Sequence, residues 1–169
     1  FFNDSLALKG KNIGMIFTFD VEEGDEVMVK TGLSAVDEKG AEENLSAEIP
    51  GWDFDEVRKG ARTLWNRELS VIEASSKDPD ILKVFYTALY HSMIAPNRYA
   101  DLDLRYWGTD GNVHVTDKFN NYTVFSLWDT FRAAHPLFTI IQPHRVPDMV
   151  SAMLNIYLQQ GKLPVWSLM

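Results

Sequence analysis

The sequence contains no cysteine in its 169 residues. This absence excludes a disulfide framework, a thiolate metal site and a cysteine nucleophile. It does not identify the cellular compartment, because exported bacterial proteins can also lack cysteine.

The sequence also lacks an excess of positive charge. Its 16 Lys and Arg against 24 Asp and Glu give a net charge of −8 at pH 7. Nucleic-acid phosphates would be repelled by this charge, so we expect no nucleic-acid partner. No run of 18 apolar residues is present, and the sequence therefore predicts no membrane span. With 46% hydrophobic and 24% charged residues, the composition is typical of a folded protein.

Several motifs of catalysis are missing as well. The sequence has no Gly-rich phosphate loop, no Gly-x-Ser-x-Gly elbow and no two histidines at the helical spacing of a metal site. It therefore gives little support to phosphate-loop, serine-hydrolase or transition-metal chemistry, and we predict no metal ligand in this chain.

One stretch, residues 119–136, combines aromatic rings with hydrogen-bonding side chains. A pyranose has a flat apolar face and a rim of hydroxyls, so an aromatic ring beside Asp and Arg is typical of a sugar pocket. Alternatively, Trp128 and Phe131 are core residues, and Asp129 satisfies amides of a helix that Ser126 caps. The aromatic residues are Phe119, Tyr122, Phe125, Trp128 and Phe131, and the polar ones are Asn120, Asn121, Asp129, Arg132 and His135.

The N-terminal part reads as β-structure. Residues 17–21 and 27–33 alternate apolar and polar side chains on either side of the turn-like segment 22–25, which predicts an antiparallel hairpin. A lone hairpin is marginal in water, so these strands need partners that the sequence does not contain. Both ends of the chain also look cut. We therefore expect a fragment of a longer protein.

The rest of the sequence predicts helices and one further hairpin. A short helix is expected at 41–47, a longer one after its cap Asp53, and another that Asp78 caps and Pro96 follows. Residues 105–107 and 113–115 predict a hairpin. A helix is expected from Ser126, then an apolar turn at 137–141, then a helix from 146 that Gly161 ends.

Six collinear blocks between residues 49 and 169 resemble the glycoside hydrolase family 92 α-mannosidases, and blocks this long are more specific than a short motif. They are residues 85–93, 95–97, 122–133, 135–137, 140–143 and 163–166. The resemblance implies the last strands of a β-sandwich domain (1–36), a helical linker (37–76) and the first helices of an α/α toroid catalytic domain, a six-hairpin glycosidase-like barrel (77–169).

The resemblance also implies a function. The whole enzyme would be exo-acting, inverting and calcium-dependent. It would remove terminal α-mannose, with α-1,2 linkages expected, from mannose-containing glycans outside the cytoplasm, in the periplasm, at the cell surface or after secretion. Trp128 and Asp129 match the family's Trp-Asp pair and would bind mannose, with Arg132 and Arg98 as weaker candidates. The catalytic acid and base are expected beyond residue 169, and most calcium ligands outside the chain.

Four further aspartates are candidate catalytic carboxylates. Asp101, Asp103, Asp110 and Asp117 lie in loop-like sequence, where Asp is expected for turn formation alone. The family pattern has a glycine where this chain has Leu104, which puts Asp103 and Arg105 in doubt as site residues.

The histidines and the basic candidates have structural alternatives too. His91 is expected in the core, His135 in a structural role, and Arg98 and Arg132 in local ion pairs. Two other functions stay open: another carbohydrate enzyme on a helical toroid, such as a trehalase-like or maltose-phosphorylase-like protein, or a sugar-binding protein without catalytic carboxylates.

Overall fold

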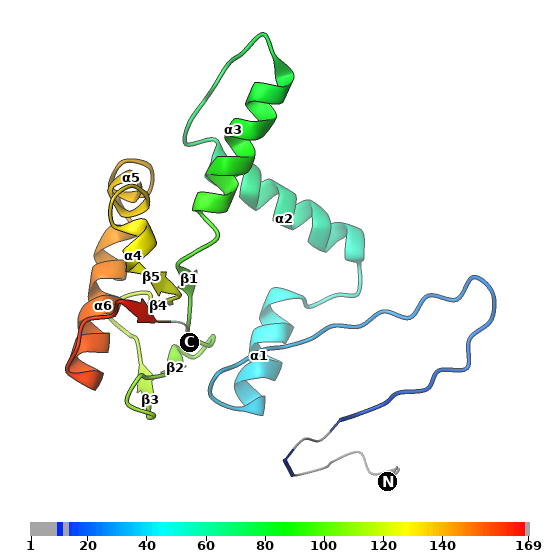
Figure 1. Ribbon diagram of the computed structural model, residues 1–169. Coiled ribbons are helices and arrows are strands. Elements are labelled where there is room, and N and C mark those ends of the chain that lie inside the picture. The colour runs from blue at the N-terminus through cyan, green and yellow to red at the C-terminus, as the bar shows by residue number, and fades with distance from the viewer. Residues whose placement is uncertain (1–9, 12–13, 168–169) are drawn as a thin grey trace.

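The computed structural model describes residues 10–11 and 14–167. This part of the chain contains helices and short antiparallel strands (Figure 1). The helices are α1 (Glu38–Glu48), α2 (Phe54–Leu69), α3 (Pro79–Ser92), α4 (Leu127–Thr130), α5 (Ala134–Ile141) and α6 (Val146–Gln160). The strands are β1 (Asn97–Arg98), β2 (Arg105–Trp107), β3 (Val113–Val115), β4 (Tyr122–Thr123), β5 (Phe125–Ser126) and β6 (Trp166–Ser167). They pair as β1 with β4, β2 with β3 and β5 with β6.

Aspartates cap the first three helices. The Asp53 side chain accepts a hydrogen bond from the Glu56 backbone N–H at 2.9 Å, and Asp78 accepts one from Asp80 at 2.9 Å. Both caps confirm the sequence prediction, because a cap depends only on residues within one turn. The helix predicted at 41–47 is longer, since it begins at Glu38 behind the cap Asp37.

The region 126–161 differs from the prediction in one respect. The helix at Ser126 is a single turn, α4, and the apolar segment predicted as a turn is the helix α5. Pro136 lies in the first turn of α5, where its missing N–H removes no intrahelical hydrogen bond. The prediction for α6 is confirmed, because Gly161 adopts φ 75° and its N–H donates to the Tyr157 carbonyl at 2.7 Å.

The predicted N-terminal strands are absent from residues 14–36. Only the turn is present, where the Asp25 N–H donates to the Glu22 carbonyl at 3.1 Å and Gly24 has φ 100°. The segment runs as the extended blue excursion of Figure 1, and its Phe17 and Val29 side chains are exposed. A hairpin without a third strand or a packing partner gains too little to form a stable ladder. The strand prediction is therefore wrong for these residues, and its part in residues 1–9 and 12–13 lies outside the described residues.

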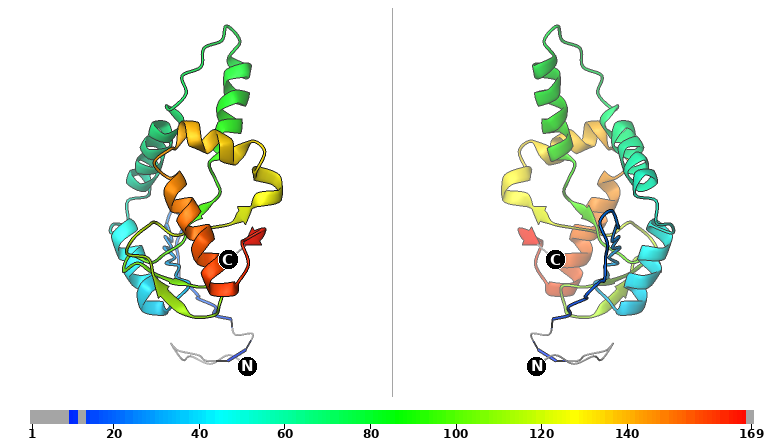
Figure 2. Two further views of the ribbon diagram at one scale, coloured as in Figure 1. Left: turned by 90° about the vertical axis from the view of Figure 1, so that its left-hand side faces the viewer. Right: turned by 90° about the vertical axis from the view of Figure 1, so that its right-hand side faces the viewer.

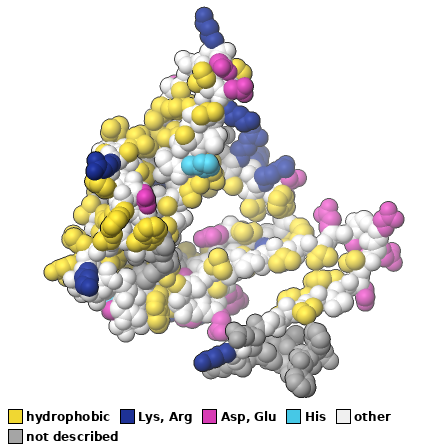
Figure 3. Space-filling model, in the orientation of Figure 1, with side chains coloured by type: hydrophobic (Ala, Val, Ile, Leu, Met, Phe, Trp, Pro, Cys, Tyr) yellow, Lys and Arg dark blue, Asp and Glu magenta, His cyan; other side chains and the backbone are white. Residues whose placement is uncertain are grey.

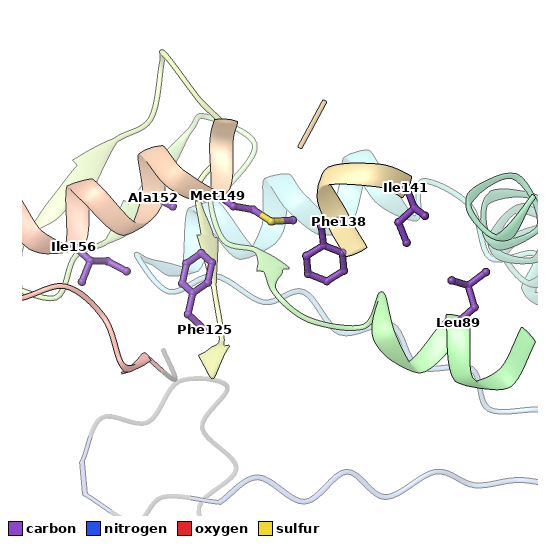
Figure 4. Close-up of a cluster of buried hydrophobic side chains, with 7 residues drawn as sticks. All are labelled: Leu89, Phe125, Phe138, Ile141, Met149, Ala152 and Ile156. Carbon is purple, nitrogen blue, oxygen red and sulfur yellow. The ribbon is translucent and has the colours of Figure 1, made fainter. Parts of the chain in front are cut away.

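The core lies in the second half of the chain. Side chains from α3, β5, α5 and α6 meet in one cluster, in which Phe125 and Phe138 are each 1% exposed (Figure 4). The cluster joins helices that are separated by the long connection between α3 and α4. Its buried members are Leu89, Phe125, Phe138, Ile141, Met149, Ala152 and Ile156.

The predicted hairpin is present as β2 and β3, with Tyr106 opposite His114. The hairpin lies between α1 and α6 (Figure 2). Its contact with α6 runs through Gln159, whose amide nitrogen donates to the Tyr106 hydroxyl at 3.0 Å and whose carbonyl accepts from the Thr109 N–H at 3.0 Å. The β2–β3 hairpin, which is part of the connection between α3 and α4, is therefore held against α6.

The predicted apolar face of α2 is not covered by other described residues. Phe54 is 72% exposed and Leu64 is 53% exposed, and α2 contacts α3 through the rings of Trp65 and Tyr90, whose centroids are 4.4 Å apart. Hydrophobic side chains also show on α5 and α6 in the space-filling view (Figure 3). No helix in the described part is long and apolar enough to cross a membrane. The division into sandwich, linker and toroid stays a prediction.

We predict that changing Leu→Ala to Leu→Gly is less destabilising at position 104 than at position 102 by about 1 kcal/mol. Leu104 has φ 69°, a conformation that costs an L-residue about 1–2 kcal/mol and costs glycine little. Leu104 is 36% exposed and Leu102 is 62% exposed, so the Leu→Ala variants account for the unequal loss of buried side chain. Both glycines gain the same backbone freedom in the unfolded state, and the remaining difference isolates this strain. Chemical denaturation of the whole protein measures it, and an equal Ala-to-Gly change in the free energy of unfolding at the two positions would contradict the prediction.

Candidate functional site

Strand β5 and helix α4 place the predicted Trp-Asp pair. Phe125 is buried, Ser126 lies opposite Trp166 in the β5–β6 pair, and the Leu127 N–H donates to the Val165 carbonyl at 3.0 Å. Helix α4 begins directly after this pairing. Trp128 and Asp129 therefore lie in the single turn of α4, next to this backbone pairing.

Trp128 and Phe131 are not core residues in the described chain. Trp128 is 74% exposed and Phe131 is 54% exposed, so neither ring is buried by the described residues. The two rings line an open apolar hollow of about 370 Å³ together with Leu127, Pro164 and Val165. An exposed Trp beside a carboxylate is the combination that a sugar face and its hydroxyls require.

Asp129 is exposed, and its carboxylate accepts a hydrogen bond from the Ser126 hydroxyl. Ser126 occupies the N-cap position as predicted, but its side chain makes no bond to the amides of α4. The hydroxyl therefore orients the carboxylate rather than capping the helix. A carboxylate has about four acceptor positions, so Asp129 keeps acceptors for a ligand.

The two weaker candidates lie apart from each other. The Arg132 guanidinium stands 4.9 Å from the Phe131 ring centroid, next to the Trp-Asp pair. Arg98 lies on β1 and lines two other cavities, one of about 560 Å³ beside Tyr122 and one of about 420 Å³ beside Tyr99. Within residues 14–167 neither arginine forms an ion pair, so the predicted ion-pair alternative is not seen there.

The larger of these cavities, beside Tyr122, is walled by α2, the end of α3, β1, β4 and the start of α6. Two polar contacts hold these elements around it: Arg145 to Glu68 at 2.7 Å, and the Asn120 amide to Asp148 at 2.7 Å. Its lining residues are Leu64, Trp65, Arg67, Glu68, Met93, Ile94, Pro96, Asn97, Arg98, Asn120, Tyr122, Gln142, His144, Arg145 and Asp148. Trp128, Asp129 and Arg132 are absent from this lining.

Sequence reasoning missed most of this cavity. Asn120 and Tyr122 were noticed as part of the aromatic stretch, whereas Gln142 and Arg145 were not singled out. The available signal in the sequence was Gln142, a single polar residue directly after the apolar run of α5, which could have indicated a polar side chain at the cavity. Glu68 comes from a helix about 77 residues earlier than Arg145, and no local pattern indicates that they meet.

Two of the loop aspartates have structural partners. Asp101 is 6% exposed and accepts hydrogen bonds from the Ser34 hydroxyl at 2.6 Å and the Asn44 amide at 2.9 Å. Asp103 accepts from the Arg105 guanidinium at 2.5 Å, and the same guanidinium reaches Asp37 at 2.8 Å. The hydrogen bond from Arg105 lowers the pKa of both Asp37 and Asp103. These contacts join the hairpin to α1.

Asp110 is likewise held within the hairpin, where the His114 ring nitrogen lies 3.0 and 3.1 Å from its two carboxylate oxygens. The His114 ring stacks on Tyr106 at 5.7 Å between centroids. The hydrogen bond from His114, supported by Asn112, lowers the pKa of Asp110 to about 2. Asp117 is exposed.

Of the two histidines with an expected place in the structure, His91 differs from the expectation and His135 agrees with it. His91 is exposed, with its ring 5.6 Å from that of Tyr90, so the core prediction is wrong. His135 packs between the rings of Phe125 and Phe138, as a structural residue does, and burial lowers its pKa.

Calcium takes six to eight oxygen ligands, several of them carboxylates in most sites. Residues 10–11 and 14–167 contain no group of three or more His, Cys, Asp or Glu side chains that could hold a metal ion. The described part of the chain therefore does not fit a calcium site by itself.

Comparison with known proteins places these residues in a family. The model of the glycosyl hydrolase family 92 catalytic domain matches residues 40–169. A solved family GH92 alpha-mannosidase from Bacteroides thetaiotaomicron is 37% identical, with a TM-score of 0.73 over 79% of this chain and 18% of that one. A family GH92 inverting mannosidase from the same bacterium is 32% identical, with the same TM-score and coverage.

A curated relative is also named as a glycosidase. An uncharacterized secreted glycosidase from Arthroderma benhamiae is 40% identical over 77 residues, which are 43% of this chain and 10% of that protein. The chain thus spans 18% of the two solved relatives and 10% of the curated one.

We predict that Asp110 stabilises the folded protein at neutral pH and that this stabilisation is lost in acid. Because its folded pKa is lowered from 3.8 to about 2, its contribution is present above pH 4 and is lost as the pH falls toward 2. Asp110→Asn should therefore lower the melting temperature of the whole protein at pH 6, and this difference should shrink below pH 4. Asp117→Asn is the exposed control, and a difference that does not change with pH would contradict the prediction.

Proposed function

Because this chain belongs to glycosyl hydrolase family 92, we propose that the whole protein is an exo-acting α-mannosidase that removes terminal α-linked mannose, with α-1,2 linkages preferred, from glycans. The observation that carries this proposal is the exposed Trp128 beside Asp129, in a chain that is 37% identical to a solved alpha-mannosidase. The proposal concerns the whole protein, of which this chain supplies part of the pocket.

In this proposal Trp128 provides the wall for the apolar face of the terminal mannose. The exposed indole has no described residue packed over most of its surface, and the hollow beside it is apolar. A sugar C–H face gains from burial against such a ring.

Asp129 accepts hydrogen bonds from mannose hydroxyls. Its bond from the Ser126 hydroxyl orients the carboxylate and leaves the other acceptor positions for the sugar. Hydrogen bonds to a charged acceptor are shorter and stronger than neutral ones, so this carboxylate would select the hydroxyl arrangement of the substrate. Arg132, which follows α4, contributes a further donor in this proposal.

The catalytic carboxyl groups are proposed to lie beyond residue 169. An inverting glycosidase uses an acid that protonates the leaving oxygen and a base that activates water, about 6.5–9.5 Å apart. One of the solved relatives is described as an inverting mannosidase. We extend this stereochemistry to the present protein, whose described residues have the role of positioning the sugar.

Calcium dependence and export are further parts of the proposal. The ion would be held by residues outside 14–167, where it would bind vicinal hydroxyls of mannose as a hard cation. Export to the periplasm, the cell surface or the medium is proposed because glycan substrates occur there and the relative from Arthroderma benhamiae is named a secreted glycosidase.

We predict that Asp129→Ala lowers kcat/KM for mannose release by about 10²–10⁴-fold. Two lost hydrogen bonds to a charged group are worth roughly 3–6 kcal/mol, and each 1.4 kcal/mol is tenfold. The measurement is free mannose released from α-1,2-, α-1,3- and α-1,6-linked mannobiose by the whole protein.

Asp117→Ala is the matched control, because Asp117 is also exposed and is not part of α4, which carries the Trp-Asp pair. Full activity of Asp129→Ala would remove Asp129 from the pocket. If the wild type released mannose from none of the linkages, the hydrolase proposal would fail and a sugar-binding protein would be favoured.

We predict that a calcium chelator abolishes mannose release and that added Ca²⁺ restores it. Mg²⁺ should restore little, since it requires a tighter octahedral site. A melting curve under each condition separates loss of the ion from unfolding. Unchanged activity in excess chelator would contradict calcium dependence and leave the pocket assignment standing.

A further inference from the structure

Strands β5 and β6 place an exposed tryptophan next to the Trp-Asp pair of α4. Trp166 on β6 lies directly opposite Ser126 on β5. The adjoining ladder hydrogen bond runs from the Leu127 N–H to the Val165 carbonyl at 3.0 Å. Ser126 and Trp166 therefore occupy a non-hydrogen-bonded position of the antiparallel ladder, which is the position where opposite side chains come closest.

Trp166 and Ser126 point away from the hydrophobic core. Phe125, the residue before Ser126 on β5, is 1% exposed, and successive strand residues point to opposite faces. Ser126 therefore points to the other face, and Trp166, directly opposite, shares it. Trp166 is 61% exposed, whereas Trp is on average a highly buried residue. Within residues 14–167 its ring has no aromatic or cationic partner.

The Asp129 carboxylate lies on the side of Ser126. The Ser126 hydroxyl donates a hydrogen bond to it, and residues three apart are neighbours on a helix surface. The backbone of Ser126 is held as well, because its carbonyl accepts from the Thr130 hydroxyl at 3.0 Å. One serine is therefore bonded to an exposed carboxylate and lies opposite an exposed indole.

This pairing favours a hydroxylated ligand over a covering of apolar protein. Asp129 forms no ion pair within residues 14–167, and apolar side chains packed over Trp166 would remove water from the nearby carboxylate without a compensating cation. A pyranose supplies both a C–H face for the indole and hydroxyl donors for the carboxylate. It satisfies the two groups at once.

We propose that Trp166 is a second aromatic wall of the mannose pocket and stacks on the mannose whose hydroxyls donate to Asp129. The inference rests on the proposed function for its ligand and adds a contact residue from β6. Trp128 is next to Asp129 along the chain, and Trp166 is across the strand pair from Ser126. The pocket thus has an aromatic ring from each of two elements, and the Trp166 indole N–H is a further donor for a sugar hydroxyl.

The test replaces Trp166 in the whole protein. Trp166→Leu should lower kcat/KM for mannose release from α-linked mannobiose about tenfold and weaken binding of free D-mannose, measured by isothermal titration, by a similar factor. Trp166→Phe keeps a smaller ring and should lose only about threefold. Trp107→Leu is the matched control, because Trp107 is also an exposed strand tryptophan and lies on β2.

Oxidation by N-bromosuccinimide, mapped by peptide mass spectrometry, tests the same contact without any variant. Trp166 should be oxidised in the sugar-free wild type and protected by saturating D-mannose, whereas oxidation of Trp107 should not depend on the sugar. A Trp166 that is unreactive without sugar is covered by other parts of the whole protein, and this result overturns the inference. Equal oxidation with and without mannose overturns it too.

The failures are distinguishable. Wild-type kcat/KM and mannose affinity in Trp166→Leu overturn the second wall, while mannose release still supports the hydrolase. A lower melting temperature of Trp166→Leu with unchanged mannose affinity assigns Trp166 to the fold and also overturns the inference. Mannose that protects Trp166 in a protein that releases mannose from no linkage overturns the proposed hydrolysis and leaves the sugar contact standing.

Discussion

Burial of the Phe125 ring in the core is the interaction on which the candidate sugar site depends. The residue before it, Val124, has φ 63°, which costs a β-branched residue roughly 1–2 kcal/mol. Burying a Phe side chain contributes about 1.5–3 kcal/mol and outweighs that cost. The chain can therefore change direction at this point. Tyr122 lies before it, in the larger cavity that Arg98 lines, and Trp128 lies after it, beside the apolar hollow.

A second constraint joins the first third of the described chain to the hairpin. Asp101 is buried, and a buried carboxylate must be hydrogen-bonded, here by Ser34 and Asn44. A Cβ on Gly40 would come within 2.4 Å of an Asp101 carboxylate oxygen, so α1 can pack here because it has no side chain at that position. Arg105 adds charged contacts at the edge of the same junction. The polar network thus takes the place of a hydrophobic contact between α1 and the hairpin.

Large apolar faces remain without cover in the described residues. Phe54 and Leu64 on α2, and Leu154 and Leu158 on α6, are each more than half exposed. Faces of this kind in soluble proteins mark contacts with further structure. An α/α toroid would cover them with additional helices, which agrees with the solved relatives being roughly four times as long as this chain. The toroid stays a prediction, and the position of the sugar pocket within it stays one too.

Local chemistry in the sequence determined the helix starts at Asp53 and Asp78, the end of α6 at Gly161, and the hairpin between β2 and β3. Each depends on residues within one turn, where backbone conformation and capping decide the outcome. Local patterns also indicated the Trp128–Asp129 pair. Only the tertiary structure decided that Arg98 lines other cavities, that the N-terminal segment forms no ladder, and that Gln142 is buried without a partner. These features arise from contacts between residues far apart in the chain, and no local periodicity encodes which distant groups meet.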